Sequence, residues 1–295
     1  MSLKPSWLKV RAPGGETYAH LKGLLRERSL HTVCEEAQCP NIGECWSSGT
    51  ATFMLLGGTC TRGCKFCAVE TGNPRGWVDV DEPRKTAEAI AGLGLEYIVV
   101  TMVNRDDLAD QGAAHVAETI TRIRAAAPEL ILETLVGDFR GEEPCVATVV
   151  RSAPHVFGHN IETVESLQRT VRDPRAGYAQ SLRVLEYARS LAPERFTKSS
   201  IMLGLGETDA ELDRAFRDLR SAGVDFLTLG QYLQPSPRHL PVERFVTPMQ
   251  FDEYRERALS CGFKYVASGP LVRSSYRAGE FYLSSLIRES TGETS

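Results

Sequence analysis

The sequence Gly57-Gly-Thr-Cys-Thr-Arg-Gly-Cys-Lys-Phe-Cys67 places three cysteines, Cys60, Cys64 and Cys67, in the order C-x3-C-x2-C. Thiolates are the ligands that iron–sulfur clusters and zinc prefer. The next cysteine is Cys145, far down the chain, so one iron of a cubane cluster would stay open to a small molecule. The pattern therefore predicts an iron–sulfur cluster with one iron that the protein does not ligate.

The same triplet is also compatible with a helical core or with a zinc site. Positions i, i+4 and i+7 share one face of a helix, so the three cysteines would then belong to a core. Gly57, Gly58 and Gly63 argue against a helix here, because glycine favours loops. A zinc site would need a fourth ligand nearby.

A second cysteine triplet, Cys34, Cys39 and Cys45, lies upstream in the order C-x4-C-x5-C. Pro40, Asn41 and Gly43 predict a loop, which can wrap a metal without helical constraint. A structural zinc with a remote fourth ligand is the alternative. Two triplets in one short segment predict two clusters.

Composition narrows the class of protein. The chain has 295 residues, 42% hydrophobic and 24% charged, which is ordinary for a globular protein. A net charge of −4 argues against a general nucleic-acid binder. No apolar run is long enough to span a membrane, and the N-terminus does not resemble a signal peptide. Six of the eight cysteines fall within residues 34–67, which favours metal binding over disulfides. This predicts the cytoplasm, or an equally reducing matrix, as the compartment.

From Thr52 onward, predicted strands and helices alternate. We expect strands at Thr52–Leu56, Tyr97–Val103, Leu130–Leu135, His155–Ile161, Thr197–Leu203 and Asp225–Leu229. We expect helices at Pro83–Leu93, Gly112–Ala127, Pro144–Arg151, Tyr178–Leu191, Ala210–Ala222 and Met249–Ser260. This order predicts an α/β fold, a partial (β/α)6 TIM-like barrel. Residues 51–264 would form the barrel, with extensions at 1–50 and 265–295.

Polar side chains follow the predicted strands, at the rim where barrels carry their chemistry. Each is also compatible with a purely structural role. Asp106 and Asp107 would cap a helix, and Gly204 and Gly206 would form an ordinary turn. Further structural assignments are a Lys198–Glu162 salt bridge, structural histidines at His31 and His159, and buried thiols at Cys145 and Cys261.

These motifs together resemble the radical S-adenosylmethionine (SAM) superfamily and, within it, the lipoyl synthases. The resemblance runs from about Pro5 to Gly279. The paired triplets and the terminal Arg273-Ser-Ser-Tyr276 are specific in combination; the remaining motifs that match are Asn104–Leu108, His159–Val164, Gly204–Thr208 and Gly230–Pro235. Met102, Gly137 and Ser200 depart from the family pattern, and none of them replaces a cysteine of either triplet.

The resemblance implies two [4Fe–4S] clusters and SAM as cofactors. Cys60, Cys64 and Cys67 would hold the cluster that binds SAM. The upstream triplet would hold an auxiliary cluster with Ser275 as its fourth ligand, and this cluster would be consumed as the sulfur source. A serine oxygen is a harder ligand than a thiolate, so this bond should break most easily. The expected candidates for SAM contacts are Asn160, Glu162 and Lys198.

The resemblance also implies an activity: insertion of sulfur at C6 and C8 of an octanoyl chain on a carrier-protein lysine. Expected partners are octanoylated carriers, such as glycine-cleavage H protein or 2-oxoacid dehydrogenase E2 subunits, and an electron donor such as ferredoxin or flavodoxin. No nucleic-acid or membrane partner is expected. One alternative function is a biotin-synthase-like sulfur insertion, which a serine-ligated cluster would exclude. The other is electron transfer by a two-cluster carrier, which would need no barrel.

Overall fold

A single sheet forms the centre of the molecule. The computed structural model describes residues 5–10, 14–47, 51–275 and 287. The strands lie in the order β1-β2-β5-β6-β7-β8-β9-β10; from β2 to β10 all neighbours are parallel, and β1 is antiparallel to β2. Their bounds are β1 (His31–Thr32), β2 (Thr52–Leu55), β5 (Tyr97–Met102), β6 (Ile131–Leu135), β7 (Val156–Gly158), β8 (Phe196–Leu203), β9 (Phe226–Gln231) and β10 (Tyr265–Gly269).

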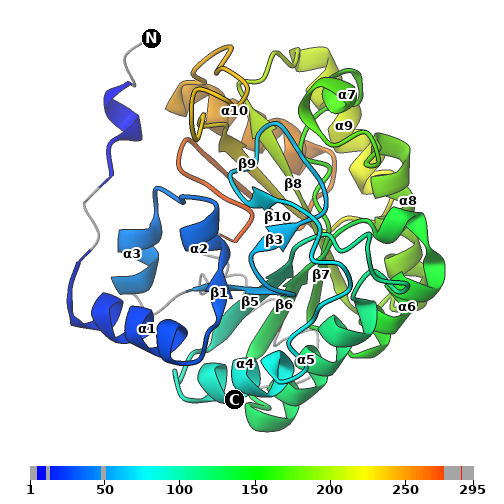
Figure 1. The fold of residues 1–295 in the computed structure, drawn as a ribbon. Helices are drawn as coiled ribbons and strands as arrows, with labels where there is room; N and C mark the ends of the chain where they lie inside the picture. Colours follow the sequence, from blue (N-terminus) through cyan, green and yellow to red (C-terminus); the bar gives the residue numbers. More distant parts are fainter. Residues whose placement is uncertain (1–4, 11–13, 48–50, 276–286, 288–295) are drawn as a thin grey trace.

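Helices surround the outside of this sheet, as Figure 1 shows. They are α4 (Glu82–Ala91), α5 (Ala113–Ala126), α6 (Glu143–Arg151), α8 (Tyr178–Leu191), α9 (Asp209–Ser221) and α10 (Pro248–Ser260). Local chemistry sets where several begin: Thr208 with Glu211, and Thr247 with Gln250, form capping boxes at the starts of α9 and α10. The remaining elements are η1 (Ser6–Leu8), α1 (Glu16–Glu27), α2 (Val33–Glu36), α3 (Ile42–Ser47), β3 (Thr59–Cys60), β4 (Glu70–Thr71), η2 (Phe139–Gly141), η3 (Glu165–Leu167) and α7 (Gln168–Val171).

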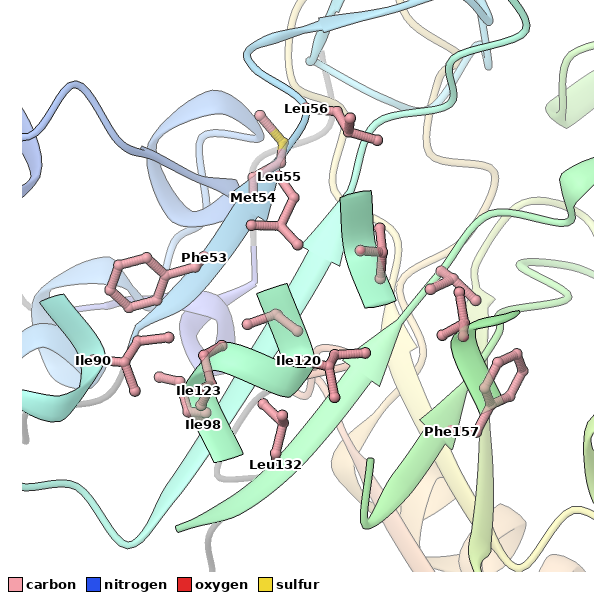
Figure 2. Packing of buried hydrophobic residues seen from close by; sticks show 14 of the residues in the cluster. Phe53, Met54, Leu55, Leu56, Ile90, Ile98, Ile120, Ile123, Leu132 and Phe157 are labelled. Atoms are coloured by element: carbon pink, nitrogen blue, oxygen red, sulfur yellow. The ribbon is translucent and has the colours of Figure 1, made fainter. Parts of the chain in front are cut away.

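Each central strand is buried on both faces, which is why the strands read as apolar runs. Side chains on the outer face, such as Phe53, Ile98 and Leu132, pack against Ile90 of α4 and Ile120 of α5 (Figure 2). The alternate side chains of the same strands therefore face the barrel interior. This alternation determines which residues can reach a site inside the barrel.

The partial α/β barrel is confirmed, with three differences from the sequence prediction. Tyr265–Gly269, expected in the C-terminal extension, forms β10 and pairs in parallel with β9, so a seventh parallel strand follows the six predicted ones. The fourth predicted strand is shorter, because β7 covers only Val156–Gly158. The segment around Cys34–Cys45 contains two short helices, α2 and α3, where a loop was predicted.

Within the described ranges, we find no helix with the length and apolar character needed to cross a membrane.

Candidate active site

A cavity of about 480 Å³ opens at the carboxyl ends of the parallel strands. Its inner wall comes from interior-facing residues of neighbouring strands, including Thr101 of β5, Leu135 of β6 and Ser200 of β8. Both cysteine triplets contribute to its outer wall: Cys34, Cys39, Cys60, Cys64 and Cys67 all line it, whereas Cys45 does not. Segments that are far apart in the sequence thus meet around one space.

The downstream triplet lies on a loop, as predicted from its glycines. Cys60 ends β3, which pairs with β4 across the loop. Backbone N–H groups point at the sulfurs: Arg62 N donates to Cys60 Sγ at 3.4 Å, and Asp173 N donates to Cys64 Sγ at 3.3 Å. The loop therefore presents its sulfurs with donors that favour a thiolate.

A network of buried charges holds this loop in place. Arg62 donates to Asp138 at 2.7 Å and to Asp106 at 3.0 and 3.1 Å. Asp173 accepts a hydrogen bond from Gly63 N at 2.9 Å and pairs with Arg175. The Arg62 guanidinium and its neighbours hold the pKa of Asp106 well below its usual range, despite the opposing effect of burial. Buried pairs of this kind fix geometry, because either charge alone would be costly.

The cap interpretation of Asp106 and Asp107 is wrong. Asp106 pairs with Arg62, and Asp107 accepts two hydrogen bonds from Arg105, both at 2.8 Å. The helix that follows begins after Gly112, which has no side chain to cap it, and it is Asp110 that accepts a hydrogen bond from Ala114 N in the first turn, at 2.9 Å. Sequence reasoning missed this network, and the only signal for it was the run of charges in Asn104–Leu108.

The upstream triplet sits on the two short helices beside β1 and β2. Thr32 caps α2 by accepting a hydrogen bond from Glu35 N, and Cys34 lies in the first turn. Cys39 lies between the helices, and Cys45 lies on α3. Burial raises the pKa of Cys34 to about 11 and also raises the pKa of Cys39.

The C-terminal segment crosses to this triplet. Asn41 Nδ2 donates to the Leu271 carbonyl at 2.6 Å, and Thr52 Oγ1 donates to Ser275 Oγ at 2.8 Å. Arg273, Ser274 and Ser275 line the same cavity as the cysteines. Tyr276, the last residue of the motif, lies outside the described residues.

Two of the three candidate SAM contacts line the cavity. Asn160 and Glu162 follow β7, and Asn160 hydrogen-bonds to the Glu162 carboxyl group. Glu162 adopts a left-handed backbone conformation with φ of 66°, which is costly for a residue with a side chain and is often found at functional sites. Burial raises the pKa of Glu162, while nearby Arg172 opposes this.

The expectation for Lys198 is not supported by its position. Its ammonium group is buried and donates to both oxygens of Glu133, at 2.8 and 2.9 Å, one layer below the cavity wall. Lys198 is absent from the cavity lining, and its ion-pair partner is Glu133, not Glu162.

Of the remaining structural assignments, that of Cys261 as a buried thiol is wrong, because Cys261 is partly exposed; the others hold. His159 bonds to the Val136 carbonyl and to Ser181 Oγ, both at 2.9 Å, as a structural histidine does. His31 contacts Glu36 at 3.0 Å. The amides of Gly204 and Leu205 both bond to Glu207 within the same turn, so they are not available to a phosphate. Cys145 is buried, and all eight cysteines are free thiols.

The donor set fits iron–sulfur clusters better than a single metal ion. In the described part of the chain, no three His, Cys, Asp or Glu side chains already meet around one point at metal-binding distance. A cluster of several irons spaces its thiolates more widely than one ion does, and the cavity lies between the sulfurs. Burial raises the pKa of Cys64 to about 11 and of Cys67 to about 12, so a cationic group must replace the protons.

Family models match two parts of the chain. The model described as "Radical SAM superfamily" matches residues 54–219, and that described as "N-terminal domain of lipoyl synthase of Radical_SAM family" matches residues 2–39.

The fold is similar to that of solved structures at low sequence identity. The FeFe-hydrogenase maturase HydG from Carboxydothermus hydrogenoformans aligns with a TM-score of 0.55 and 13% identity, over 82% of this chain and 66% of that one. Streptococcus suis SuiB, solved bound to S-adenosylmethionine, aligns with a TM-score of 0.55 and 8% identity, over 78% of this chain and 55% of that one. At such identities only the fold is shared.

Similar sequences cover nearly the whole chain. Lipoyl synthase of Sorangium cellulosum (strain So ce56) is 58% identical, over 97% of this chain and 81% of the relative. Lipoyl synthase of Myxococcus xanthus (strain DK1622) is also 58% identical, over 96% of this chain and 95% of the relative. The mitochondrial lipoyl synthase of Zea mays is 56% identical, over 96% of this chain and 76% of the relative. The chain belongs to the lipoyl synthase family of the radical SAM superfamily.

Proposed function

We propose that this chain inserts two sulfur atoms, at C6 and C8, into an octanoyl group amide-linked to a lysine of a carrier protein, and so forms lipoyl-lysine. The observation that carries this proposal is that residues of both cysteine triplets and Ser275 line one cavity. A radical source and a sulfur source that act on the same carbon chain must both face it.

The residues divide into two ligand sets. Cys60, Cys64 and Cys67 would hold the [4Fe–4S] cluster that binds SAM; Cys34, Cys39, Cys45 and Ser275 would hold an auxiliary [4Fe–4S] cluster. When bound, the first supplies the electron for reductive cleavage of SAM, and the second supplies sulfur. Asn160 and Glu162 would position SAM, since both line the cavity and the Glu162 carboxyl group acts on Cys64 and Cys67.

The cavity suits an alkyl chain. Met54, Met102, Leu135 and Met202 give it a largely apolar wall, which would bind methylene groups and exclude water from a reactive carbon. The polar amide end of the substrate would remain at the mouth. Carriers of this chemistry include glycine-cleavage H protein and 2-oxoacid dehydrogenase E2 subunits, with ferredoxin or flavodoxin as electron donor.

The division of the chain follows the same ligand sets. Residues 1–50 would bring the auxiliary ligands, the barrel from residue 51 would bind SAM, and the segment after β10 would close on the auxiliary site. Eight free thiols suit a reducing compartment such as the cytoplasm.

Alanine substitution of each triplet tests the proposal. Replacing Cys60, Cys64 and Cys67 together should abolish 5′-deoxyadenosine formation, because the iron that binds SAM is lost. Replacing Cys34, Cys39 and Cys45 should leave 5′-deoxyadenosine formation but remove lipoyl product, because only the sulfur source is lost. Both products are measured by mass spectrometry with an octanoylated carrier under anaerobic reduction. Lipoyl product from the upstream variant without added sulfide would contradict the assignment.

A further inference from the structure

Arg273 brings a positive charge to the upstream triplet. Its Nη1 donates to the Val272 carbonyl at 2.7 Å, and the side chain lines the cavity. Within the described residues, the group that attracts this guanidinium is the Cys39 thiol, and no carboxylate pairs with it. An arginine in a cavity wall without an acidic partner is suited to an anion.

The backbone holds Arg273 at this place. The Asn41–Leu271 and Thr52–Ser275 hydrogen bonds fix the segment on either side of it. On the β9 side, the segment crosses so closely over Gly230 that a Cβ there would lie 2.0 Å from the Val272 carbonyl oxygen and 3.5 Å from Arg273 Nη1. The flanking hydrogen bonds and the close contact with Gly230 therefore fix the position of the Arg273 guanidinium group.

Trp46 supplies a second donor to the same triplet. Its side chain is fully buried, and its ring packs on Tyr18 with centroids 5.0 Å apart. The indole N–H has no partner of ordinary hydrogen-bond geometry among the described residues, and the acceptor that it addresses is the Cys34 sulfur. A buried donor without an oxygen or nitrogen acceptor is costly unless an electron-rich group meets it.

The downstream triplet has different surroundings. Cys64 and Cys67 interact with the Glu162 carboxyl group, and Arg172 offsets this effect at Cys64. Both triplets therefore accept N–H donors and lie near an arginine, and the difference between them is the Glu162 carboxyl group, which acts on Cys64 and Cys67 of the downstream triplet.

We propose that Arg273 and Trp46 are positioning residues that stabilise negative charge on the sulfur-donating centre of Cys34, Cys39 and Cys45, making it easier to reduce and slower to lose iron. Thiolates, sulfides and a serine oxygen give such a centre net negative charge, and nearby cations and N–H···S bonds raise its reduction potential. When bound, the centre would take up one electron for each C–S bond that a carbon radical forms with one of its sulfides, so residues that ease its reduction would favour sulfur transfer. The inference rests on the proposed function.

The test compares variants of the reconstituted holoenzyme. Arg273→Gln removes the charge, Arg273→Lys retains it, and Trp46→Phe retains the ring but removes the N–H. Tyr18→Phe, which changes the ring partner of Trp46, is the matched control. Reductive titration followed by electron paramagnetic resonance separates the two centres, because added SAM alters the signal only of the centre that binds it.

Arg273→Gln should lower the midpoint potential of the SAM-insensitive signal and speed iron loss to a chelator by on the order of tenfold, as loss of outer ligand contacts commonly does. Trp46→Phe should shift both in the same direction by less. Arg273→Lys and Tyr18→Phe should both keep a midpoint potential and a rate of iron loss close to those of the parent protein. The midpoint potential of the SAM-sensitive signal should be unchanged in every variant. Unchanged potential and iron loss in both Arg273→Gln and Trp46→Phe would overturn the inference. A parent protein with iron and sulfide for one cluster only would instead overturn the proposed function.

Discussion

At the scale of single residues, Ser274 and Ser275 are neighbours of identical chemistry in different surroundings. Both line the cavity, but it is Ser275 Oγ that accepts the hydrogen bond from Thr52 at 2.8 Å, beside the upstream triplet. A hydroxyl held there is well placed to be a ligand that is later released. The difference between the two serines can be measured.

Ser275→Cys should keep both clusters and still cleave SAM, but stall before sulfur insertion is complete. A thiolate binds iron more firmly than a serine oxygen, so the centre would not open. Ser274→Cys should behave like the parent. The measurement is the ratio of octanoyl, monothiolated and lipoyl carrier in a single turnover. If Ser274→Cys stalled in place of Ser275→Cys, Ser274 would be the ligand.

His159 gives a prediction about pH. Burial lowers the pKa of His159 to about 4, and its neutral Nδ1–H donates to the Val136 carbonyl. A histidine with a depressed folded pKa contributes stability above its unfolded pKa of about 6.5, and this stability falls as the pH falls toward 4. From pH 7 to 5 the cluster-free protein should lose about 2 kcal/mol through this group. Urea unfolding of the parent and of His159→Gln at both pH values checks this; equal losses would contradict it.

Sequence reasoning found the residues whose chemistry is local and missed those whose role depends on contacts across the fold. Cysteine spacing predicted both triplets as candidate ligand sets, since their members lie close in the chain, and residues of both triplets line one cavity. Arg62 was not predicted, because its partners Asp106 and Asp138 lie 44 and 76 residues away. The ion-pair partner of Lys198 was wrong for the same reason: it is Glu133, 65 residues away, and not Glu162.

At the scale of elements, the close crossing of the C-terminal segment over β9 depends on one glycine. A side chain at Gly230 would meet the backbone carbonyl of Val272 at 2.0 Å. Backbone cannot yield as a flexible side chain can, so the whole segment would have to move.

Gly230→Ala should therefore displace Arg273 and Ser275 from the upstream triplet. Lipoyl formation should fall by on the order of tenfold or more, as loss of supporting contacts at metal sites commonly causes, while SAM cleavage persists. Gly177→Ala is the matched control, because its Cβ would meet only the Gln180 Cβ, at 3.9 Å. Equal lipoyl yields from the two variants would show that the crossing is not needed.

Elements with a strong helical pattern were predicted closely, and α8 was predicted to the residue. Two features were not predicted. β10 forms because Tyr265–Gly269 pairs with β9, and local patterns do not encode long-range pairing. The short helices α2 and α3 form on either side of Pro40, and α3 includes Gly43, although these residues predicted a loop.

At the scale of the whole molecule, the barrel interior is closed below the cavity. The lowest part of the cavity wall is formed by Thr101, Leu135 and Ser200. The next layer of the barrel interior contains the residues two positions earlier on the same strands: Val99, Glu133 and Lys198. Tyr97 donates to Glu133 at 2.6 Å, and the apolar cluster beneath includes Phe196, Phe226 and Ile287.

Lys198→Met should destabilise the protein by about 3–5 kcal/mol, because it leaves the Glu133 carboxylate buried without its partner. SAM affinity, measured on the folded variant, should stay near that of the parent, since Lys198 does not line the cavity. Urea unfolding and equilibrium binding measure the two quantities. The double variant Lys198→Met, Glu133→Leu should recover much of the lost stability. A large loss of SAM affinity with unchanged stability would restore Lys198 as a contact.

The closed lower end of the barrel limits the route by which small molecules reach the cavity. Buried side chains of the described residues block the lower end of the barrel. Small molecules therefore enter and leave through the mouth of the cavity, at the carboxyl ends of the strands. The proposed chemistry uses two SAM molecules for each octanoyl group. The methionine and 5′-deoxyadenosine formed from the first SAM would therefore leave through the cavity mouth that holds the carrier's lysine arm. The second SAM would enter through the same mouth. Because the first C–S bond would join the octanoyl chain to a sulfide of the auxiliary centre, the lysine arm would stay in the cavity mouth between the two insertions, and SAM would have to be exchanged beside it before the second insertion.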